Sequence, residues 1–207
     1  MSLHDDAVRT LESWAAPDRD QDVLRRDFLT HLSTHPDGLA RSCVPAHVTA
    51  SALIVSPKRG EILLMLHRKA GMWLQAGGHC EAGDATLAGA ALREATEESG
   101  ILGLVLSGDP VRLDRHPAPC RPGVVEHHLD VQYLAIAPPG SVPRRSEESL
   151  ELAWFPYDQL PSPSDVDALV ATATAAYTST SADHPSSSMP AAWVRPSRKP
   201  RARSDRG

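Results

Sequence analysis

Three glutamates lie close together at helical spacing near the middle of the chain. Glu94, Glu97 and Glu98 are separated by three and four residues, so a helix would place all of them on one face. Arg93 precedes them, and Gly100 follows two residues after the last. Like charges crowded on one face cost free energy unless a positive group lies between them. Oxygen ligands in this number suit a hard cation such as Mg²⁺ or Mn²⁺, so we expect a site for phosphate chemistry here.

The composition is that of a globular protein of one medium domain with extensions. The chain has 207 residues, enough for a substantial core, and only 4% of them are aromatic. Its three cysteines are too few and too far apart for a disulfide framework, so we expect a reducing, cytoplasmic location. No apolar run reaches the ~18 residues of a membrane span, and the polar N-terminus does not resemble a signal peptide.

The net charge of −5 is unevenly distributed. The segment 181–207 holds six Lys or Arg and two Asp, a balance of +4, so the rest of the chain has a charge of −9. An acidic body argues against nucleic-acid binding by the fold itself.

The pattern of apolar residues predicts three parts. Residues 1–43 form a helical extension with two short helices within 5–33, which could dock on the core or on a second subunit as a homodimer. Residues 44–180 form the main domain and 181–207 the disordered tail; the composition rich in Ser, Pro and Arg that predicts disorder is already present beyond residue 179. Within the main domain we expect strands over 48–55, 61–68, 73–75, 102–106, 124–137 and 151–155, a helix over 86–99, a helical turn over 156–161 and a closing helix over 164–177.

The strand predicted over 124–137 has an unusually polar face. Glu126, His128, Asp130 and Gln132 alternate with apolar or aromatic neighbours there. For His128, ordinary strand packing or surface exposure is the simpler interpretation, with catalysis as the alternative.

Residues 78–101 resemble the signature of the Nudix hydrolases, G-x5-E-x7-R-E-U-x-E-E-x-G-U with U apolar. Its second half matches at every fixed position from Arg93 to Ile101. The first half has one residue more than the signature, because Gly78 and Arg93 enclose fourteen residues instead of thirteen. The first glutamate of the signature falls on Asp84 when counted from Gly78 and on Ala85 when counted from Arg93, so it is replaced or displaced.

The resemblance implies an α/β fold of the Nudix type, an α/β/α sandwich with a mixed β-sheet, here with the N-terminal helical extension. It also implies a pyrophosphohydrolase, an enzyme that cleaves an acid anhydride in a nucleoside diphosphate linked to another group. ADP-ribose, a nucleotide sugar or a nucleoside triphosphate would be such a small-molecule nucleotide substrate. The resemblance further implies roles for particular residues: Glu94, Glu97 and Glu98 would hold Mg²⁺ or Mn²⁺, and Arg93 would orient the glutamates. Gly77 and Gly78 would let the backbone approach the substrate, and Arg68 would contact phosphate.

Two questions stay open at the level of sequence. The general base could be Glu147, Glu148 or Glu151, or else Glu126 or His128 on the polar strand face. The missing first glutamate also allows a second hypothesis, a non-catalytic Nudix-type module that binds a nucleotide or a protein. For Cys80, a nucleophile would need a nearby base and a lowered pKa, and neither is visible in the sequence.

Overall fold

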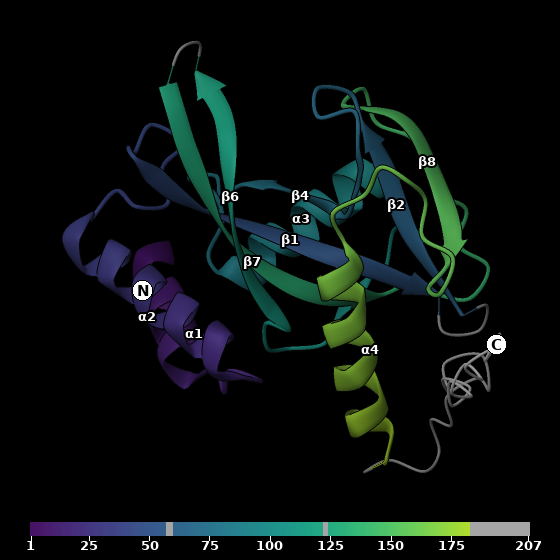
Figure 1. Ribbon diagram of the computed structural model, residues 1–207, viewed down its shortest axis with the longest axis horizontal. Helices are drawn as coiled ribbons and strands as arrows, with labels where there is room; N and C mark the ends of the chain where they lie inside the picture. Colours follow the sequence, from purple (N-terminus) through teal and green to yellow (C-terminus); the bar gives the residue numbers. More distant parts are fainter. Residues whose placement is uncertain (57–59, 122–123, 183–207) are drawn as a thin grey trace, which may run out of the picture.

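The computed structural model describes residues 1–56, 60–121 and 124–182, and in these ranges one mixed sheet forms the centre of the molecule (Figure 1). Its central strands follow the order β3-β2-β1-β7-β5, while β4 pairs with β1, β6 with β7 and β8 with β2. The helices are α1 (Leu3–Ser13), α2 (Arg19–Thr34), α3 (Leu87–Ser99) and α4 (Asp167–Ala182). The strands are β1 (Ala46–Ser56), β2 (Glu61–His67), β3 (Trp73–Leu74), β4 (Ala76–His79), β5 (Val105–Leu106), β6 (Arg112–Arg121), β7 (Val124–Ile136) and β8 (Ser149–Pro156).

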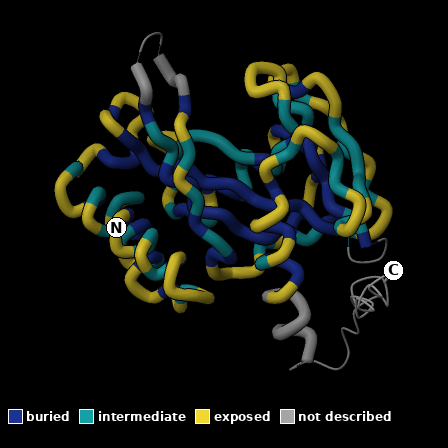
Figure 2. Tube along the Cα trace, in the orientation of Figure 1, coloured by how far each residue is buried: buried dark blue, intermediate teal, exposed yellow. Residues whose placement is uncertain are grey.

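The two longest strands, β1 and β7, run parallel through the core. Their register extends from Ala46 opposite His127 to Val55 opposite Ile136. Alternate residues of β1, including Ala50 and Ile54, belong to the core beneath α1, α2 and α3, whereas Leu53 and Val55 face the cluster that α4 completes. The sheet is therefore covered on both faces, and Figure 2 shows its central strands as buried. This is the α/β sandwich with a mixed sheet that the sequence predicted.

The N-terminal extension docks on the core of its own chain. Ser2 begins α1 with a capping box, and the Asp18 side chain caps α2. The buried Gln21 side chain of α2 makes two hydrogen bonds to the backbone of Leu113 in β6, at 2.7 and 3.0 Å. The Asp6 carboxylate accepts a hydrogen bond of 2.9 Å from the Leu87 amide at the start of α3. Of the two placements that the sequence left open, the contacts show docking on the core.

Four sequence-based expectations differ from the structure. The strand predicted over 102–106 is only Val105–Leu106, because Gly103 adopts a φ of 76° before it. The segment 156–161 forms a turn rather than a helix. The strand β6 was not predicted at all. The closing helix runs on to Ala182, past the residue where disorder was expected, and residues 183–207 of the predicted disordered tail lie outside the described part.

None of the helices within the described ranges is long and apolar enough to cross a bilayer.

Candidate active site

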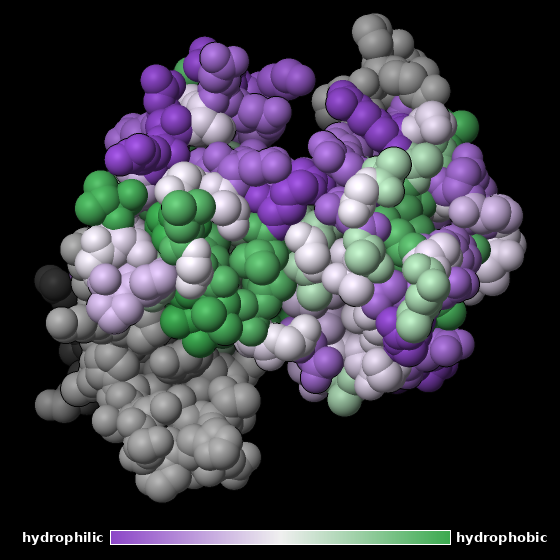
Figure 3. Space-filling model, turned by 180° about the vertical axis from the view of Figure 1, so that it is seen from behind, coloured by the Kyte–Doolittle hydropathy of each residue, from purple (hydrophilic) through white to green (hydrophobic). Residues whose placement is uncertain are grey.

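The acidic stretch lies on α3, as its spacing predicted. The Thr86 side chain caps the first turn by accepting a hydrogen bond from the Gly89 amide, and Gly100 ends the helix with a φ of 64°. Ala91 and Ala95 are buried against the sheet, so the small side chains of one helix face let α3 pack closely. This packing orients the glutamates. Figure 3 shows the molecule from the side on which α3 lies, with hydrophilic residues gathered in the upper part of that face and hydrophobic ones below.

Two of the three glutamates converge on strand β4. The Glu98 carboxylate accepts a hydrogen bond of 2.8 Å from the Gly77 amide, and its side chain is buried. The Glu94 carboxylate lies so close to Gly78 that a Cβ there would come within 2.7 Å of it. Glu97, with a side chain that is 59% exposed, lies at the solvent side of the same helix face.

Gly77 and Gly78 of β4 have no room for a side chain, because each is in close contact with another group. A Cβ at Gly77 would lie 2.2 Å from the Cβ of Ser51 on β1, and one at Gly78 would meet the Glu94 carboxylate. The resemblance implied that these glycines let the backbone approach the substrate, and no contact among the described residues tests this. The groups they approach here are a neighbouring strand and a glutamate of α3.

Arg93 is bonded on several sides. Its guanidinium donates to both oxygens of Asp84, at 3.1 and 3.0 Å, and to the backbone carbonyl of His79 at 3.0 Å. It also donates to Glu94 at 3.0 Å and to Glu97 at 3.2 Å. These charge-assisted bonds raise the pKa of Arg93, so the side chain is a fixed positive charge that ties the loop before α3 to the helix itself.

The partner of Arg93 identifies the residue in the first half of the motif. Asp84 is the sixth residue after Gly78, and its carboxylate forms a bidentate ion pair with Arg93. The hydrogen bonds from Arg93 lower the pKa of Asp84, which is therefore ionised at neutral pH. Asp84 thus stands where the signature has its first glutamate, and the additional residue lies between Asp84 and Arg93.

Burial disfavours the ionised form of the two inner glutamates of α3, and their mutual charges add to this effect. Burial raises the pKa of Glu94, and burial together with the charges of Glu94, Glu148 and Glu97 raises the pKa of Glu98 to about 8. A positive ion among these oxygens would offset both effects.

The loop that precedes β8 acts on this cluster through its charge. The Glu148 charge contributes to the raised pKa values of both Glu94 and Glu98. Arg68, exposed at the end of β2, holds the loop through its amide to the Glu148 carbonyl (3.1 Å) and its Nε to the Glu147 carbonyl (3.2 Å). Of the candidate bases predicted from the sequence, Glu148 is the one whose charge raises the pKa values of Glu94 and Glu98.

The other candidate bases lie elsewhere. Glu151 is exposed on β8. Glu126 is fully buried, with its Oε2 at 3.7 Å from Nδ1 of His47, and the His128 ring packs against those of His47 and His79. The polar face of β7 therefore forms a second group of polar residues. The membership of His47, His79 and His116 in this group was not predicted from the sequence; the ring centroid of His116 lies 5.3 Å from that of His128.

Asp130 is the centre of the hydrogen bonds on that polar face. Its buried carboxylate accepts from Thr49 at 3.0 Å and from Ser51 at 2.6 Å on β1, and from Gln132 and Gln75 at 3.1 and 3.3 Å. Burial raises its pKa, although these bonds act in the opposite direction.

Cys80 is not activated as a nucleophile. Burial raises the pKa of its thiol to about 12, so the thiolate is absent at neutral pH.

The fold and this acidic helix define a class of protein, a hydrolase with an α/β/α sandwich and a carboxylate cluster on one helix. Residues 45–175, more than half of the chain, match the family model of the NUDIX domain. The chain belongs to the Nudix family, and the predicted enzyme class, a Nudix pyrophosphohydrolase, is confirmed at that level.

Solved structures similar to this chain include several Nudix proteins. A NUDIX-family hydrolase from Clostridium perfringens is 26% identical, with 64% of this chain and 97% of that one covered and a TM-score of 0.49. A MutT NUDIX hydrolase from Burkholderia pseudomallei is 30% identical, with 61% and 95% covered and a TM-score of 0.48. An ADP-ribose pyrophosphatase from Streptococcus suis is 20% identical, with 55% and 76% covered and a TM-score of 0.41. Among curated protein sequences, none matches significantly.

Proposed function

We propose that this protein hydrolyses the pyrophosphate bond of a nucleoside diphosphate linked to another group, with Mg²⁺ or Mn²⁺ held by Glu94, Glu97 and Glu98. The observation that supports this most strongly is the convergence of Glu94 and Glu98 on consecutive residues of β4, beside the fixed charge of Arg93. Burial raises the pKa of both carboxylates, and a bound cation would favour their ionised form.

The donor set fits a hard divalent cation. All three side chains offer carboxylate oxygen, the ligand type that Mg²⁺ and Mn²⁺ prefer. Glu97 lies toward solvent, which leaves room for a substrate on that side. When bound, such a cation neutralises phosphoryl oxygens and makes a coordinated water more acidic.

The residues around the cluster would position the substrate and the water. Arg93, held by Asp84, keeps the glutamates in place by charge-assisted bonds. Arg68 is exposed beside the loop, so its side chain would attract a phosphate group. Glu148 would accept the proton of the attacking water, because it is the candidate base whose charge contributes to the raised pKa of Glu98.

The intact Asp84–Arg93 pair supports the enzyme over a binding module without turnover. The binding hypothesis depended on the loss of the first glutamate of the motif, and Asp84 supplies a carboxylate in that loop, paired with Arg93. We place the protein in the cytoplasm, in line with the free thiols of Cys43 and Cys80.

A substrate panel tests this function. Purified protein with Mg²⁺ is offered ADP-ribose, a nucleotide sugar and a nucleoside triphosphate, and the released nucleotide or phosphate is measured. At least one of them should be cleaved, and Glu94→Gln should slow that cleavage by at least about 100-fold, more than the usual cost of an outer-shell partner. Nucleotide binding without any turnover by the wild-type protein would show a binding module instead.

A further inference from the structure

Three histidines from three different strands meet on the face of the sheet toward α4. His47 of β1, His79 of β4 and His128 of β7 form this histidine cluster, and one ring nitrogen of each lies within 4.8 Å of the others. Their ring centroids are 5.1, 4.9 and 5.0 Å apart. Among the residues that the structure describes, these are the three that come together with the spacing of a metal site.

The backbone register of the sheet fixes this arrangement. His47 lies directly opposite His128 in the parallel pair of β1 and β7, and His79 lies opposite Thr49 in the antiparallel pair of β1 and β4. Residues two apart in a strand share a face, so His47 points to the same side as Thr49. The Thr49 hydroxyl donates to Asp130 of β7, which shares its face with His128. The three imidazoles are therefore presented by rigid backbone and not by loops.

A hydrogen bond from Nδ1 of His47 fixes the tautomer of its imidazole ring. Its Nδ1 lies 3.3 Å from the Cys43 carbonyl, an atom that only accepts, so Nδ1 bears the proton and the ring would bind a metal through Nε2. The carboxylate of the fully buried Glu126 lies 3.7 Å from the same Nδ1. A carboxylate or carbonyl behind a ligating histidine is the usual arrangement at zinc sites, where it fixes the tautomer and raises the basicity of the ring.

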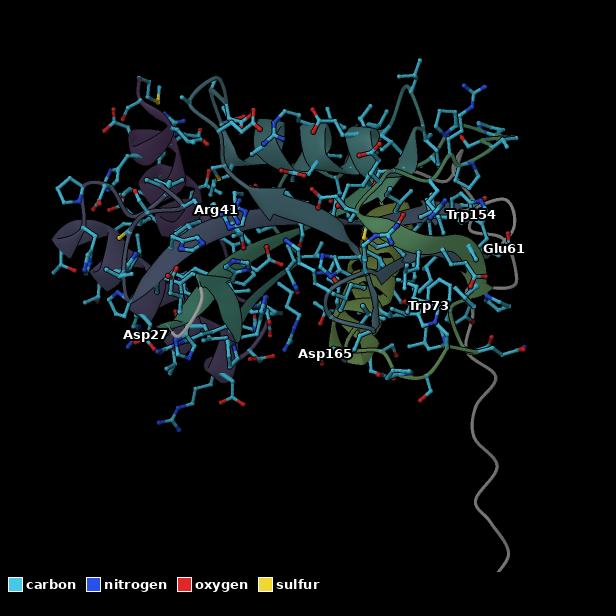
Figure 4. All side chains as sticks on the ribbon, turned by 90° about the horizontal axis from the view of Figure 1, so that it is seen from above. Asp27, Arg41, Glu61, Trp73, Trp154 and Asp165 are labelled. Carbon is cyan, nitrogen blue, oxygen red and sulfur yellow. The ribbon has the colours of Figure 1, made fainter. Side chains whose placement is uncertain are left out.

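The other two rings are neutral at physiological pH. Burial lowers the pKa of His79 to about 4 and that of His128 to about 3, and nearby positive charges, including Arg41, act in the same direction. Arg41, labelled in Figure 4 near the start of β1, is exposed. The charge of the buried Glu126 acts in the opposite direction and raises the pKa of His79.

We propose that His47, His79 and His128 form a second metal site, for a divalent transition-metal ion of the Zn²⁺ type, with water in the fourth position and Glu126 orienting His47. Imidazole nitrogen suits Zn²⁺, whereas the oxygen cluster on α3 suits Mg²⁺, so the two sites differ in the ion they take. Nitrogens bound to one Zn²⁺ at ~2.0–2.1 Å lie roughly 3.3 Å apart in a tetrahedron. Small rotations of rings that are already within 4.8 Å of one another are enough to reach this geometry.

The site would act on the catalytic region through β4. Neighbouring residues of a strand point to opposite faces, so His79 faces the histidine cluster while Gly78, next to it, meets Glu94. The backbone carbonyl of His79 also accepts a hydrogen bond from Arg93. A metal ion on His79 would therefore hold the strand against which the acidic helix is aligned.

Metal titration of the untagged protein tests the proposal. The protein is stripped with a chelator and titrated with Co²⁺, which gives visible absorption bands of tetrahedral nitrogen coordination, and with Zn²⁺ in competition with a chromophoric chelator. We expect one equivalent of either ion to bind. His79→Ala and His128→Ala should each weaken Zn²⁺ binding by more than about 100-fold, and Glu126→Gln should weaken it by about 10–100-fold, as for an outer-shell partner.

Two controls separate this site from other metal ligands. His67→Ala removes a half-buried histidine at the end of β2, and the double variant Glu94→Gln/Glu98→Gln removes the oxygen cluster. Both should keep the wild-type Co²⁺ spectrum. The proposal is overturned if no Co²⁺ bands appear, if both histidine variants bind Zn²⁺ like the wild type, or if only the glutamate variant loses binding. Far-UV circular dichroism of each variant verifies its fold, and His79→Ala suffices should His128→Ala not fold.

Discussion

Replacement of Glu98 by glutamine should stabilise the metal-free protein at neutral pH. Glu98 is 5% exposed, and its pKa is raised from the ordinary 4.5 to about 8, mainly by burial. In the unfolded chain the carboxyl group ionises near pH 4.5, whereas in the folded chain it keeps its proton up to about pH 8. The folded state thus binds more protons in this range, and the free energy of unfolding falls as the pH rises from about 4.5 to about 8.

The size of the effect follows from the same pKa. At roughly 1.4 kcal/mol per pH unit, the difference between 4.5 and about 8 sets an upper limit of about 5 kcal/mol. Local rearrangement and water entry reduce such penalties, so we expect Glu98→Gln to raise the free energy of unfolding by about 1–3 kcal/mol at pH 8. The amide oxygen of glutamine still accepts the hydrogen bond of the Gly77 amide. Near pH 4.5 the two proteins should differ little.

Urea unfolding with EDTA, at pH 5 and at pH 8, measures this difference. Glu97→Gln is the matched control, because that side chain is 59% exposed and should change stability by less than about 0.5 kcal/mol at either pH. Mg²⁺ favours the ionised carboxylate, so its addition at pH 8 should stabilise the wild type more than Glu98→Gln. If Glu98→Gln is less stable than the wild type at pH 8 without metal, then Glu98 is not a buried, destabilising charge and this reasoning is wrong.

Three further predictions concern the residues around the cluster. Asp84→Asn should weaken the bidentate pair with Arg93 and lower kcat/KM by about 10–100-fold, as steady-state kinetics would show; an unchanged value would mean that Asp84 does not support the site. Gly77→Ala places a Cβ 2.2 Å from that of Ser51 and should lower the free energy of unfolding by about 1–3 kcal/mol; an unchanged thermal unfolding temperature would contradict this. Glu148→Gln should lower kcat by about 100-fold or more, whereas the exposed Glu151→Gln should leave kcat unchanged.

The elements that position the acidic cluster follow from local sequence. The helix over 86–99 was predictable because its small apolar residues recur at helical spacing and Gly100 ends it. The central strand β1 was equally clear, because the β-branched and apolar residues of 48–55 end in the apolar run 52–55, which is typical of a strand buried on both faces. Both predictions depend on interactions within one segment, which sequence patterns describe well.

Features that depend on distant segments were not predictable in this way. Strand β6 contains Pro117 and several charged residues, and it pairs with β7 alone among the described strands; an edge position tolerates proline, but no local pattern indicates it. The histidine cluster has no local signal either, because the register of β1, β4 and β7 brings its members together. The sequence left Asp84 and Ala85 as alternatives for the position of the first motif glutamate, and the hydrogen bond of 3.1 Å between Arg93 and Asp84 favours Asp84.

The role of the glutamates is tested most directly by Mg²⁺-dependent cleavage of the best substrate of the panel, measured side by side for the wild type, Glu98→Gln and Glu151→Gln. We expect Glu98→Gln to lower kcat/KM by at least about 1000-fold, equivalent to about 4 kcal/mol of transition-state stabilisation. The exposed Glu151→Gln should stay within about threefold of the wild type, which corresponds to less than ~1 kcal/mol. Equal activity of all three proteins would contradict the assignment of the acidic helix as the catalytic metal site.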